Sequence, residues 1–335
     1  MEKRNIILSF DYELFFGIYS GTVQKTLIEP TNILLDSMEK NGMKGNFFVD
    51  VFMFWAFEEL SDSKIKSDLN LLKNQIYDII RRGHRIELHL HPHWIDAKYK
   101  GEGKWDFSVY QHYSLTSFSE DEVTDYIVKG TDYLNQLARE VDSNYQICAF
   151  RAGGWAVQPF EHLKRGFIYS NIQIDSSVAS GAYGLNQYSF FDFTKAPKNS
   201  CWRFHDDVCK PDDNGIFYEV PITSFHRGLL YRTIDWLSRR IVNTLSPVTD
   251  GTHKRIDLVE APHPKSSKNI AMMTMSKLSP ISVLLSFLLC KSKIVTFIDH
   301  PKDLSLSVIT TMSLISKYSR SIFYSDLLCL PLAEK

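Results

Sequence analysis

Short apolar runs rich in β-branched and aromatic residues alternate along the chain with stretches of helical periodicity. Two of these stretches lie at 31–41, after Pro30, and at 68–82, before Gly83. Strands separated by helices are typical of a parallel sheet or a barrel. About eight of the apolar runs predict strands, at residues 5–10, 45–50, 85–89, 146–150, 172–175, 216–222, 256–259 and 294–298.

A third helix is expected directly after Ser119, because Glu122 completes a capping box three residues later. The segments 94–118 and 190–215 are polar and rich in turn residues, so we expect them to be loop insertions over one face of the sheet. These features predict one barrel-like α/β domain over residues 1–335 instead of two domains joined by a linker.

Composition excludes several classes of protein. The 335-residue chain is 44% apolar, so it is not a disordered protein. Its 38 Lys and Arg residues balance 39 Asp and Glu residues, for a net charge of -1. That balance argues against a nucleic-acid binder that uses a broad basic surface, and it provides no polybasic membrane anchor.

The cysteines and the N-terminus bear on the cellular compartment. An odd count of five cysteines without CxxC spacing favours reduced thiols over a disulfide scaffold or a cysteine zinc site. The first apolar run is broken at Asp11, and no small-residue cleavage site follows, so we expect no secretory signal. The most apolar later stretch, 281–290, is about half the length of a membrane-spanning helix. We therefore expect a cytoplasmic protein without a transmembrane segment.

Three histidines, His89, His91 and His93, follow one of the predicted strands within five residues. Neutral imidazole is a common ligand of zinc and similar divalent metals. This cluster predicts a metal site at the end of the strand. The alternative is a polar surface turn.

Two carboxylates, Asp11 and Glu13, come just after the first predicted strand. Residues two apart in a strand face the same side, so both side chains could converge on one site. Barrel enzymes carry their active-site groups at such strand ends. Read from spacing alone, the same residues also fit an acidic turn.

Two further segments place candidate residues at strand ends. Arg151 follows the run at 146–150, and Gly153 and Gly154 would let the backbone approach a neighbour closely. His300 follows the run at 294–298. Taken singly, the Arg151 segment fits an ordinary surface turn, and His300 fits a histidine with a structural role.

Together these motifs resemble, in order, those of the polysaccharide deacetylases of carbohydrate esterase family 4, the chitooligosaccharide-deacetylase (NodB) homology domain. The resemblance extends from about Asn5 to Asp303. It covers the opening Ser-Phe-Asp motif, an H-x-x-x-H motif, an arginine motif with a nearby glycine and a late histidine. The opening and the His-Pro ending look like the bacterial branch that trims surface polysaccharides, such as lipopolysaccharide or capsule.

The chain departs from the family pattern in three places. Tyr12 stands where the family has a second aspartate, so the metal carboxylate moves to Glu13. The arginine motif lacks the usual proline. His263, within Ala-Pro-His-Pro, competes with His300 for the late position, and we favour His300 because its strand is the stronger one.

The resemblance implies a distorted (β/α) barrel of about seven strands and a divalent metal bound by Glu13, His89 and His93. Zinc is the favoured metal, and cobalt, nickel or iron would also suit two imidazoles and a carboxylate. His91, between the two histidine ligands, is expected to support them without binding the metal itself.

The resemblance also implies the catalytic residues Asp11, Arg151 and His300. Asp11 would be the general base, Arg151 would pair with it, and His300 would protonate the leaving amine. A neighbouring carboxylate should then raise the pKa of His300. The substrate would be an N-acetylated sugar or polysaccharide, and the products acetate and a free amino sugar.

Two other functions remain open at this stage. His89-x-His91 matches the H-x-H pair of barrel amidohydrolases, whose substrates would be cyclic or small amides. A carbohydrate-binding relative that has lost turnover is the non-enzymatic alternative. The sequence does not indicate an oligomeric state.

Overall fold

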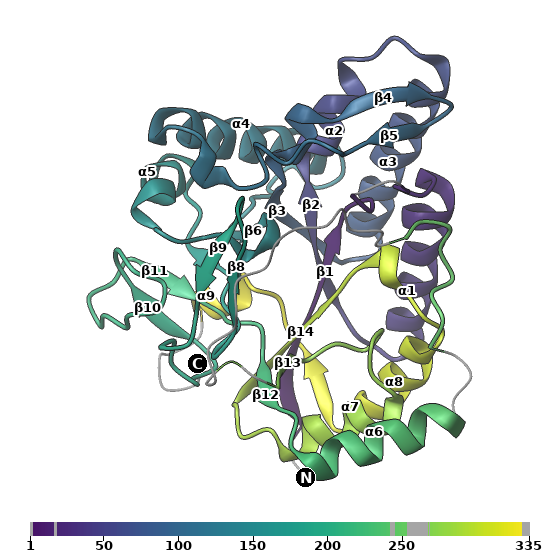
Figure 1. Ribbon diagram of the computed structural model, residues 1–335, viewed down its shortest axis with the longest axis vertical. Helices are drawn as coiled ribbons and strands as arrows, with labels where there is room; N and C mark the ends of the chain where they lie inside the picture. The colour runs from purple at the N-terminus through teal and green to yellow at the C-terminus, as the bar shows by residue number, and fades with distance from the viewer. Residues whose placement is uncertain (1–2, 17–18, 242–244, 253–266, 268, 330–335) are drawn as a thin grey trace.

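A curled sheet forms the centre of the protein. The computed structural model describes residues 3–16, 19–241, 245–252, 267 and 269–329. In this part of the chain the sheet has nine strands in the order β10-β11-β7-β6-β3-β2-β1-β14, with β15 also pairing with β1 (Figure 1). The strands are β1 (Arg4–Tyr12), β2 (Gly45–Asp50), β3 (Arg85–Leu90), β6 (Ala149–Ala152), β7 (Ile174–Asp175), β10 (Trp202–Phe204), β11 (Phe217–Glu219), β14 (Ile294–Asp299) and β15 (Ser319–Ser321).

All neighbouring strands of this sheet are parallel except β10 and β11. Backbone hydrogen bonds outside the regular ladders join β14, at one edge of the sheet, to Thr223, which follows β11, and to Met273. Thr223 N donates to Thr296 O (3.1 Å), and Ile298 N donates to Met273 O (2.9 Å). The residue before Thr223 donates to Val178 O. The seven strands β1, β2, β3, β6, β7, β11 and β14 thus form a distorted barrel, as predicted.

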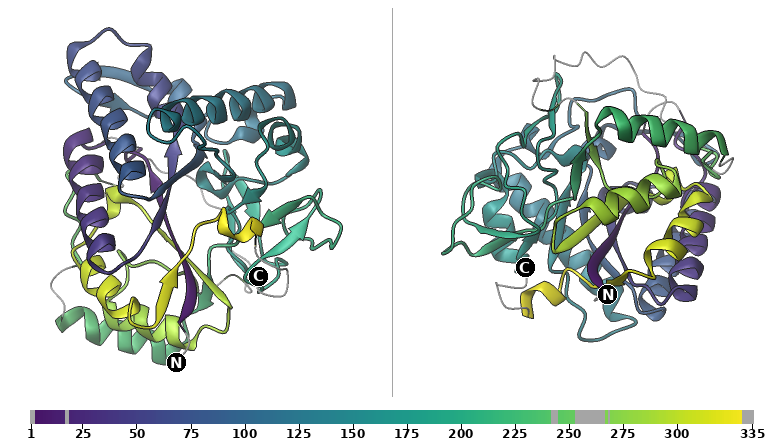
Figure 2. Two further views of the ribbon diagram at one scale, coloured as in Figure 1. Left: turned by 180° about the vertical axis from the view of Figure 1, so that it is seen from behind. Right: turned by 90° about the horizontal axis from the view of Figure 1, so that it is seen from below.

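Helices cover the outside of this barrel (Figures 1 and 2). They are α1 (Glu29–Lys40), α2 (Val51–Glu58), α3 (Ser63–Arg81), α4 (Glu120–Arg139), α5 (Glu161–Ser170), α6 (Leu229–Ile241), α7 (Pro280–Leu289) and α8 (Ser307–Ile315). The short helix α9 (Asp326–Cys329) instead packs Leu327 against the inward residues at the N-terminal end of the strands. The predicted capping box of Ser119 and Glu122 is confirmed at the start of α4. Among the described helices, none combines the length and the apolar character needed to cross a bilayer.

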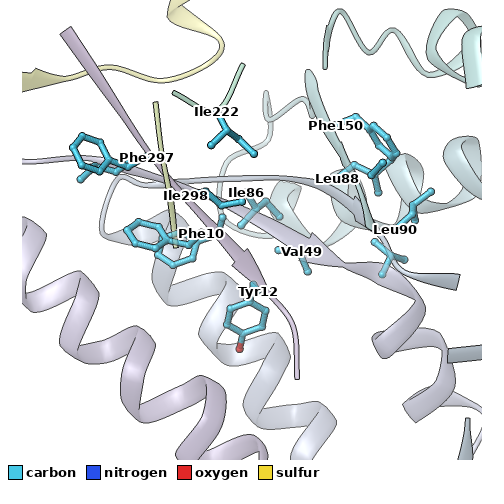
Figure 3. Close-up of a cluster of buried hydrophobic side chains, with 14 of the residues drawn as sticks. Phe10, Tyr12, Val49, Ile86, Leu88, Leu90, Phe150, Ile222, Phe297 and Ile298 are labelled. Carbon is cyan, nitrogen blue, oxygen red and sulfur yellow. The ribbon is translucent and has the colours of Figure 1, made fainter. Parts of the chain in front are cut away.

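Alternation along the strands separates an apolar outer layer from an inner space that is apolar at one end and polar at the other. Phe10, Leu88 and Phe150 face outward and belong to the buried cluster in Figure 3. Leu88 lies against α4 at Gly130, and the Phe150 ring contacts Phe167 of α5. Since successive strand residues face opposite sides, the residues next to these three along each strand point into the barrel.

The inner space is apolar at the N-terminal end of the strands. Ile7, Phe48 and Ile294 pack there against Tyr324 and Leu327 from the C-terminal segment. At the other end, where the strands finish, the inward side chains are polar, among them Asp11 and His89. The fold therefore places any chemistry at the C-terminal end of the barrel.

Two of the differences between the predicted and the observed elements have a visible cause. Strand β6 begins at Ala149 instead of 146, because the backbone N–H groups of Cys148 and Ala149 donate to the Glu87 carboxylate. Helix α3 begins at Ser63, since the Asp62 side chain caps it. The predicted strand 256–259 lies outside the described residues, as does His263.

The predicted loop insertions contain regular structure. The first includes the hairpin β4 (Lys98–Gly101) and β5 (Lys104–Asp106). The second contributes β10 to the main sheet, and β9 (Phe190–Asp192), which pairs with β8 (Tyr183–Leu185). A further pair joins β12 (Ser224–His226) to β13 (Ile270–Met272).

A buried histidine at the start of β3 should make stability depend on pH. The His84 ring is 2% exposed, and its Nδ1 accepts a hydrogen bond from Gly45 N (3.0 Å). Burial, with Lys44 and Arg82 nearby, lowers the pKa of His84 to about 4, from about 6.5 in an unfolded chain.

Below pH 6.5 the unfolded chain binds this proton and the folded chain does not. The free energy of unfolding should therefore fall by up to about 3 kcal/mol as the pH decreases from 6.5 toward 4. Urea unfolding of the wild type and of His84→Gln at several pH values measures this difference. Parallel pH curves for the two proteins would contradict the prediction.

Candidate active site

Three side chains meet at the C-terminal end of the barrel: Glu13 after β1, and His89 and His91 at the end of β3. Glu13 Oε2 lies 3.3 Å from Nε2 of each histidine, and all three ligand atoms are within 4.8 Å of one another. Glu13 Oε2 and His89 Nε2 are buried without a hydrogen-bond partner. A buried carboxylate with two imidazole nitrogens facing it fits a divalent metal with an open coordination position.

Each histidine of this group is held by a neighbour. His89 Nδ1 lies 2.7 Å from Arg151 O, so Nδ1 carries a hydrogen and Nε2 is the nitrogen that faces Glu13. Burial opposes charge on His89, but the Glu13 and Asp11 carboxylates raise its pKa to about 9. Metal binding must therefore displace a proton from this ring. Burial lowers the pKa of His91 to about 3, which keeps that ring neutral.

His93, expected as the third ligand, lies outside the group, and His91 takes its place. The Nδ1 atom of His93 is 2.9 Å from His91 Nδ1, so His93 supports His91 from the side away from Glu13. The reason is local. Strand β3 ends at Leu90, and a 3-10 turn over Pro92–Asp96 rotates His93 away, whereas His89 and His91 keep the two-residue spacing of one strand face.

The predicted glycines explain how closely the neighbouring strand approaches His91. A Cβ on Gly153 would lie 2.8 Å from the His91 ring and 2.7 Å from Leu90 O. Gly154 has a positive φ of 59°, a conformation that favours glycine. The Gly-Gly pair therefore lets the Arg151 strand end lie directly against the histidine motif.

Asp50, at the end of β2, was not predicted from the sequence. Its Oδ1 accepts from His91 N (3.1 Å), and its Oδ2 accepts from Trp94 Nε1 (2.7 Å). Burial raises the pKa of Asp50 to about 7. Its position after an apolar run, like that of Asp11, was the signal available in the sequence.

Asp11 and Arg151 form a buried ion pair beside the Glu13 group. Arg151 Nη1 donates to Asp11 Oδ1 (2.5 Å), and the guanidinium is completely buried. Its Nη2 donates to Ser9 Oγ (2.9 Å) and Tyr324 OH (3.1 Å). Burial works to raise the pKa of Asp11, but Arg151 holds it below the usual value, so Asp11 is ionised.

His300 lies on the other side of Asp11. Its Nε2 is 3.5 Å from Asp11 Oδ2 and 3.6 Å from Glu13 Oε1. The expectation of a raised pKa is wrong: burial lowers the pKa of His300 to about 4, although these carboxylates and Asp303 oppose the shift. The imidazole is therefore neutral at neutral pH until a neighbour delivers a proton.

Lys302 is the second residue that the sequence did not reveal. It is 2% exposed, and its Nζ donates to Glu13 Oε1 (2.7 Å) and Leu14 O (3.2 Å). The Phe16 ring lies 4.3 Å from the ammonium. Lys302 thus occupies one oxygen of Glu13 and leaves the other facing the histidines. A single lysine after a strand resembles an ordinary surface lysine, so the sequence had no signal for it.

Replacing Lys302 with methionine should make the metal-free protein less stable by about 3–5 kcal/mol, because the buried Glu13 would lose the cation that binds its Oε1. Added metal should restore more stability in this variant than in the wild type, since a divalent cation would then neutralise Glu13. Thermal unfolding with and without chelator measures both effects. Lys277, a half-exposed lysine paired with Asp303 (2.8 Å), supplies the control Lys277→Met. Equal metal-induced stabilisation in the wild type and Lys302→Met would contradict the prediction.

A pocket of about 470 Å³ opens over these residues. Asp11, Glu13, His89, His91 and His300 form its floor. Flat rings suit contact with the apolar faces of sugars, and its walls carry many: Phe16, Tyr110, Tyr113, Trp155, Tyr183 and Phe191. The site therefore combines a metal-ligand set, an ionised carboxylate and an aromatic-lined cavity.

Comparisons with known proteins give similarity at the level of structure alone. No family model matches the chain, and no curated protein matches it. A peptidoglycan N-acetylglucosamine deacetylase is similar over 97% of this chain and 88% of that chain, with 13% identity and a TM-score of 0.43. A family 4 carbohydrate esterase from Streptomyces lividans is similar over 94% and 87%, with 8% identity and a TM-score of 0.38. Because both TM-scores are below 0.5, we argue the function from this chain's own side chains.

Proposed function

We propose that this protein is a metal-dependent hydrolase that removes N-acetyl groups from amino sugars. One observation carries the proposal: the arginine-held carboxylate of Asp11 lies between the Glu13–His89–His91 group and His300, at the end of a barrel. The order of the corresponding sequence motifs resembles that of carbohydrate esterase family 4. The aromatic pocket over the site suits a sugar ring.

The residues divide into ligands and proton carriers. Glu13, His89 and His91 would hold the metal, which supplies a Lewis acid and a water of lowered pKa when bound. Asp11 is ionised and positioned to accept a proton from an attacking water.

Arg151 keeps Asp11 in place through Nη1. The 3.5 Å between Asp11 Oδ2 and His300 Nε2 is a short path for that proton toward the leaving nitrogen. His300 would then release it to the amine as the general acid.

We also propose a metal, a class of substrate and a cellular compartment for this protein. Two imidazoles and one carboxylate suit zinc, and they also accept cobalt, nickel or iron. The bacterial form of the motifs supports a surface polysaccharide or its precursor as substrate, within lipopolysaccharide or capsule synthesis. Five free cysteines are consistent with a cytoplasmic site of action.

The His89–His91 pair also fits the amidohydrolase alternative, because it is the H-x-H pair of that class. Two features favour the deacetylase. The pair lies on β3, not on an early strand, and Asp11 and Glu13 precede it on β1. Cyclic amides therefore belong in the test as rival substrates.

Acetate release from N-acetylglucosamine oligosaccharides tests the proposal. We expect acetate from the metal-loaded protein, none after chelation, and recovery when divalent metal is restored. Dihydropyrimidine-type cyclic amides should not be opened. Turnover of the cyclic amide alone would establish the rival, and metal and sugar binding without acetate release would establish a non-catalytic binding protein.

His300→Ala should lower turnover of an acetamide by about 10² or more, yet lower turnover of an aryl acetate ester far less. The reason is that an amine must be protonated to leave, whereas a phenolate leaves without help. Parallel kinetics on the two substrates measure the difference. The control is His263→Ala, at the rival late motif, which should lose less on the amide. Reversed behaviour of the two variants would place the general acid at His263.

A further inference from the structure

The outer face of α6 exposes large apolar side chains to solvent. Leu229 is 82% exposed, Trp236 52% and Leu237 49%. Spacings of seven and eight residues place them along one side of the helix. We call these three residues the α6 stripe. Figures 1 and 2 show α6 on the outside of the molecule.

Among the described residues of α6, two polar ones lie on the side that packs against the protein, beside the half-buried Tyr231 and Ile234. Asp235 and Ser238 are buried, and Ser238 Oγ lies 2.6 Å from Ser279 Oγ at the start of α7. A water-exposed helix normally buries its apolar side and exposes its polar side. Helix α6 instead exposes Leu229, Trp236 and Leu237, so its outward side suits an apolar or amphipathic surface better than bulk water.

The charge around the stripe has one sign. Arg232, Arg239 and Arg240 are exposed, and the Arg240 guanidinium lies 3.8 Å from the Trp236 ring. The single carboxylate of α6, Asp235, is 8% exposed and is paired with Arg239 (2.7 Å). The outward side of α6 is thus apolar and cationic.

The neighbouring helix α7 also exposes apolar side chains. It carries no charged residue, and it exposes Ile281 (51%) and Leu289 (69%). Lys291 and Lys293, just after it, are also exposed. An occupant of this surface must therefore accept apolar side chains and carry negative charge.

We propose that the α6 stripe and its arginines dock this protein on an anionic lipid surface. A helix with Trp and Leu on one face and arginines beside them lies in the plane of a bilayer interface, with the arginines at the lipid phosphates. Trp is favoured at this depth. The 13 residues of α6 span about 20 Å, which suits a helix that lies on a membrane rather than crossing it.

The docking surface is joined to the wall of the active-site pocket. Arg239 donates to Lys277 O, and Lys277 lines that pocket. A lipid-bound α6 would therefore bring the pocket wall to the membrane, where a lipid-linked sugar would be found. Docking itself does not depend on the proposed function, because binding to vesicles requires no turnover.

Sedimentation with vesicles tests the proposal. We expect the wild type to bind phosphatidylcholine vesicles that contain phosphatidylglycerol, and to bind pure phosphatidylcholine vesicles much less. The double variant Trp236→Ser/Leu237→Ser should bind at least about tenfold more weakly. Arg232→Gln and Arg240→Gln should each weaken binding about fivefold, and added salt should weaken wild-type binding.

The matched control removes exposed apolar side chains from another helix. Ile168 and Tyr169 of α5 are 51% and 68% exposed, and Ile168→Ser/Tyr169→Ser should bind like the wild type. Circular dichroism and thermal unfolding of each variant verify the fold. Undiminished binding by Trp236→Ser/Leu237→Ser, or equal loss in the α5 control, would overturn the proposal. So would a wild type that ignores vesicles but forms a dimer through the α6 stripe, because a second copy would then cover it.

Discussion

Replacing Asp11 with asparagine should reduce turnover by about 10² to 10⁴ while leaving the metal in place. Asparagine keeps the oxygen that accepts from Arg151 Nη1, so the strand end should hold its geometry. It cannot accept the proton of an attacking water. Asp11 also lies outside the Glu13–His89–His91 ligand group, so the substitution removes no metal ligand.

Elemental analysis together with acetate release measures both parts of this prediction. Glu13→Gln is the matched control, because it changes the other carboxylate of the same strand end and should lose metal. If Asp11→Asn lost the metal and Glu13→Gln kept it, the roles of the two carboxylates would be the reverse of those proposed.

Substitution of the two neighbouring histidines should affect metal binding unequally. His91→Ala removes a ligand atom that lies 3.3 Å from Glu13 Oε2, and we expect the metal content to fall to a trace. His93→Ala removes only the ring that supports His91 Nδ1. Loss of such a supporting partner typically costs about 10- to 100-fold in metal affinity.

Competition with a chromophoric chelator measures the two affinities, and His89→Ala gives the reference for loss of a ligand. A larger loss of metal affinity in His93→Ala than in His91→Ala would show that His89 and His93, the H-x-x-x-H pair of the sequence motif, are the ligands. The metal-bound protein would then have rearranged the turn after Leu90.

The barrel and most of the site could be predicted because their signals are local. An apolar run followed by Asp11, His89, Arg151 or His300 indicates a strand and a polar group at its end. Parallel strands bring such ends to one edge, so convergence follows from the fold. No side chain needs to be located for that argument.

The exchange of His91 and His93 could not be predicted in this way. It depends on whether the chain stays extended as far as His93 or turns at Pro92, and both paths fit the sequence. Lys302 was missed for a related reason. Its burial against Glu13 depends on the 3-10 turn over Pro301–Asp303, which follows the strand without a marked sequence pattern.

The contact between Arg151 and Tyr324 bears on how this protein folds during its synthesis. The two residues are 173 positions apart, and the tyrosine hydroxyl accepts from the guanidinium that holds Asp11. Strand β1 likewise needs β14 as a neighbour, since Asn5 pairs with Ile294. A nascent chain on the ribosome therefore lacks one neighbour of β1 until Ile294 has emerged, and the hydroxyl bound to Arg151 until Tyr324 has emerged. Such late, long-range closure slows folding and leaves an open sheet edge exposed, which makes the unfinished polypeptide a client for chaperones.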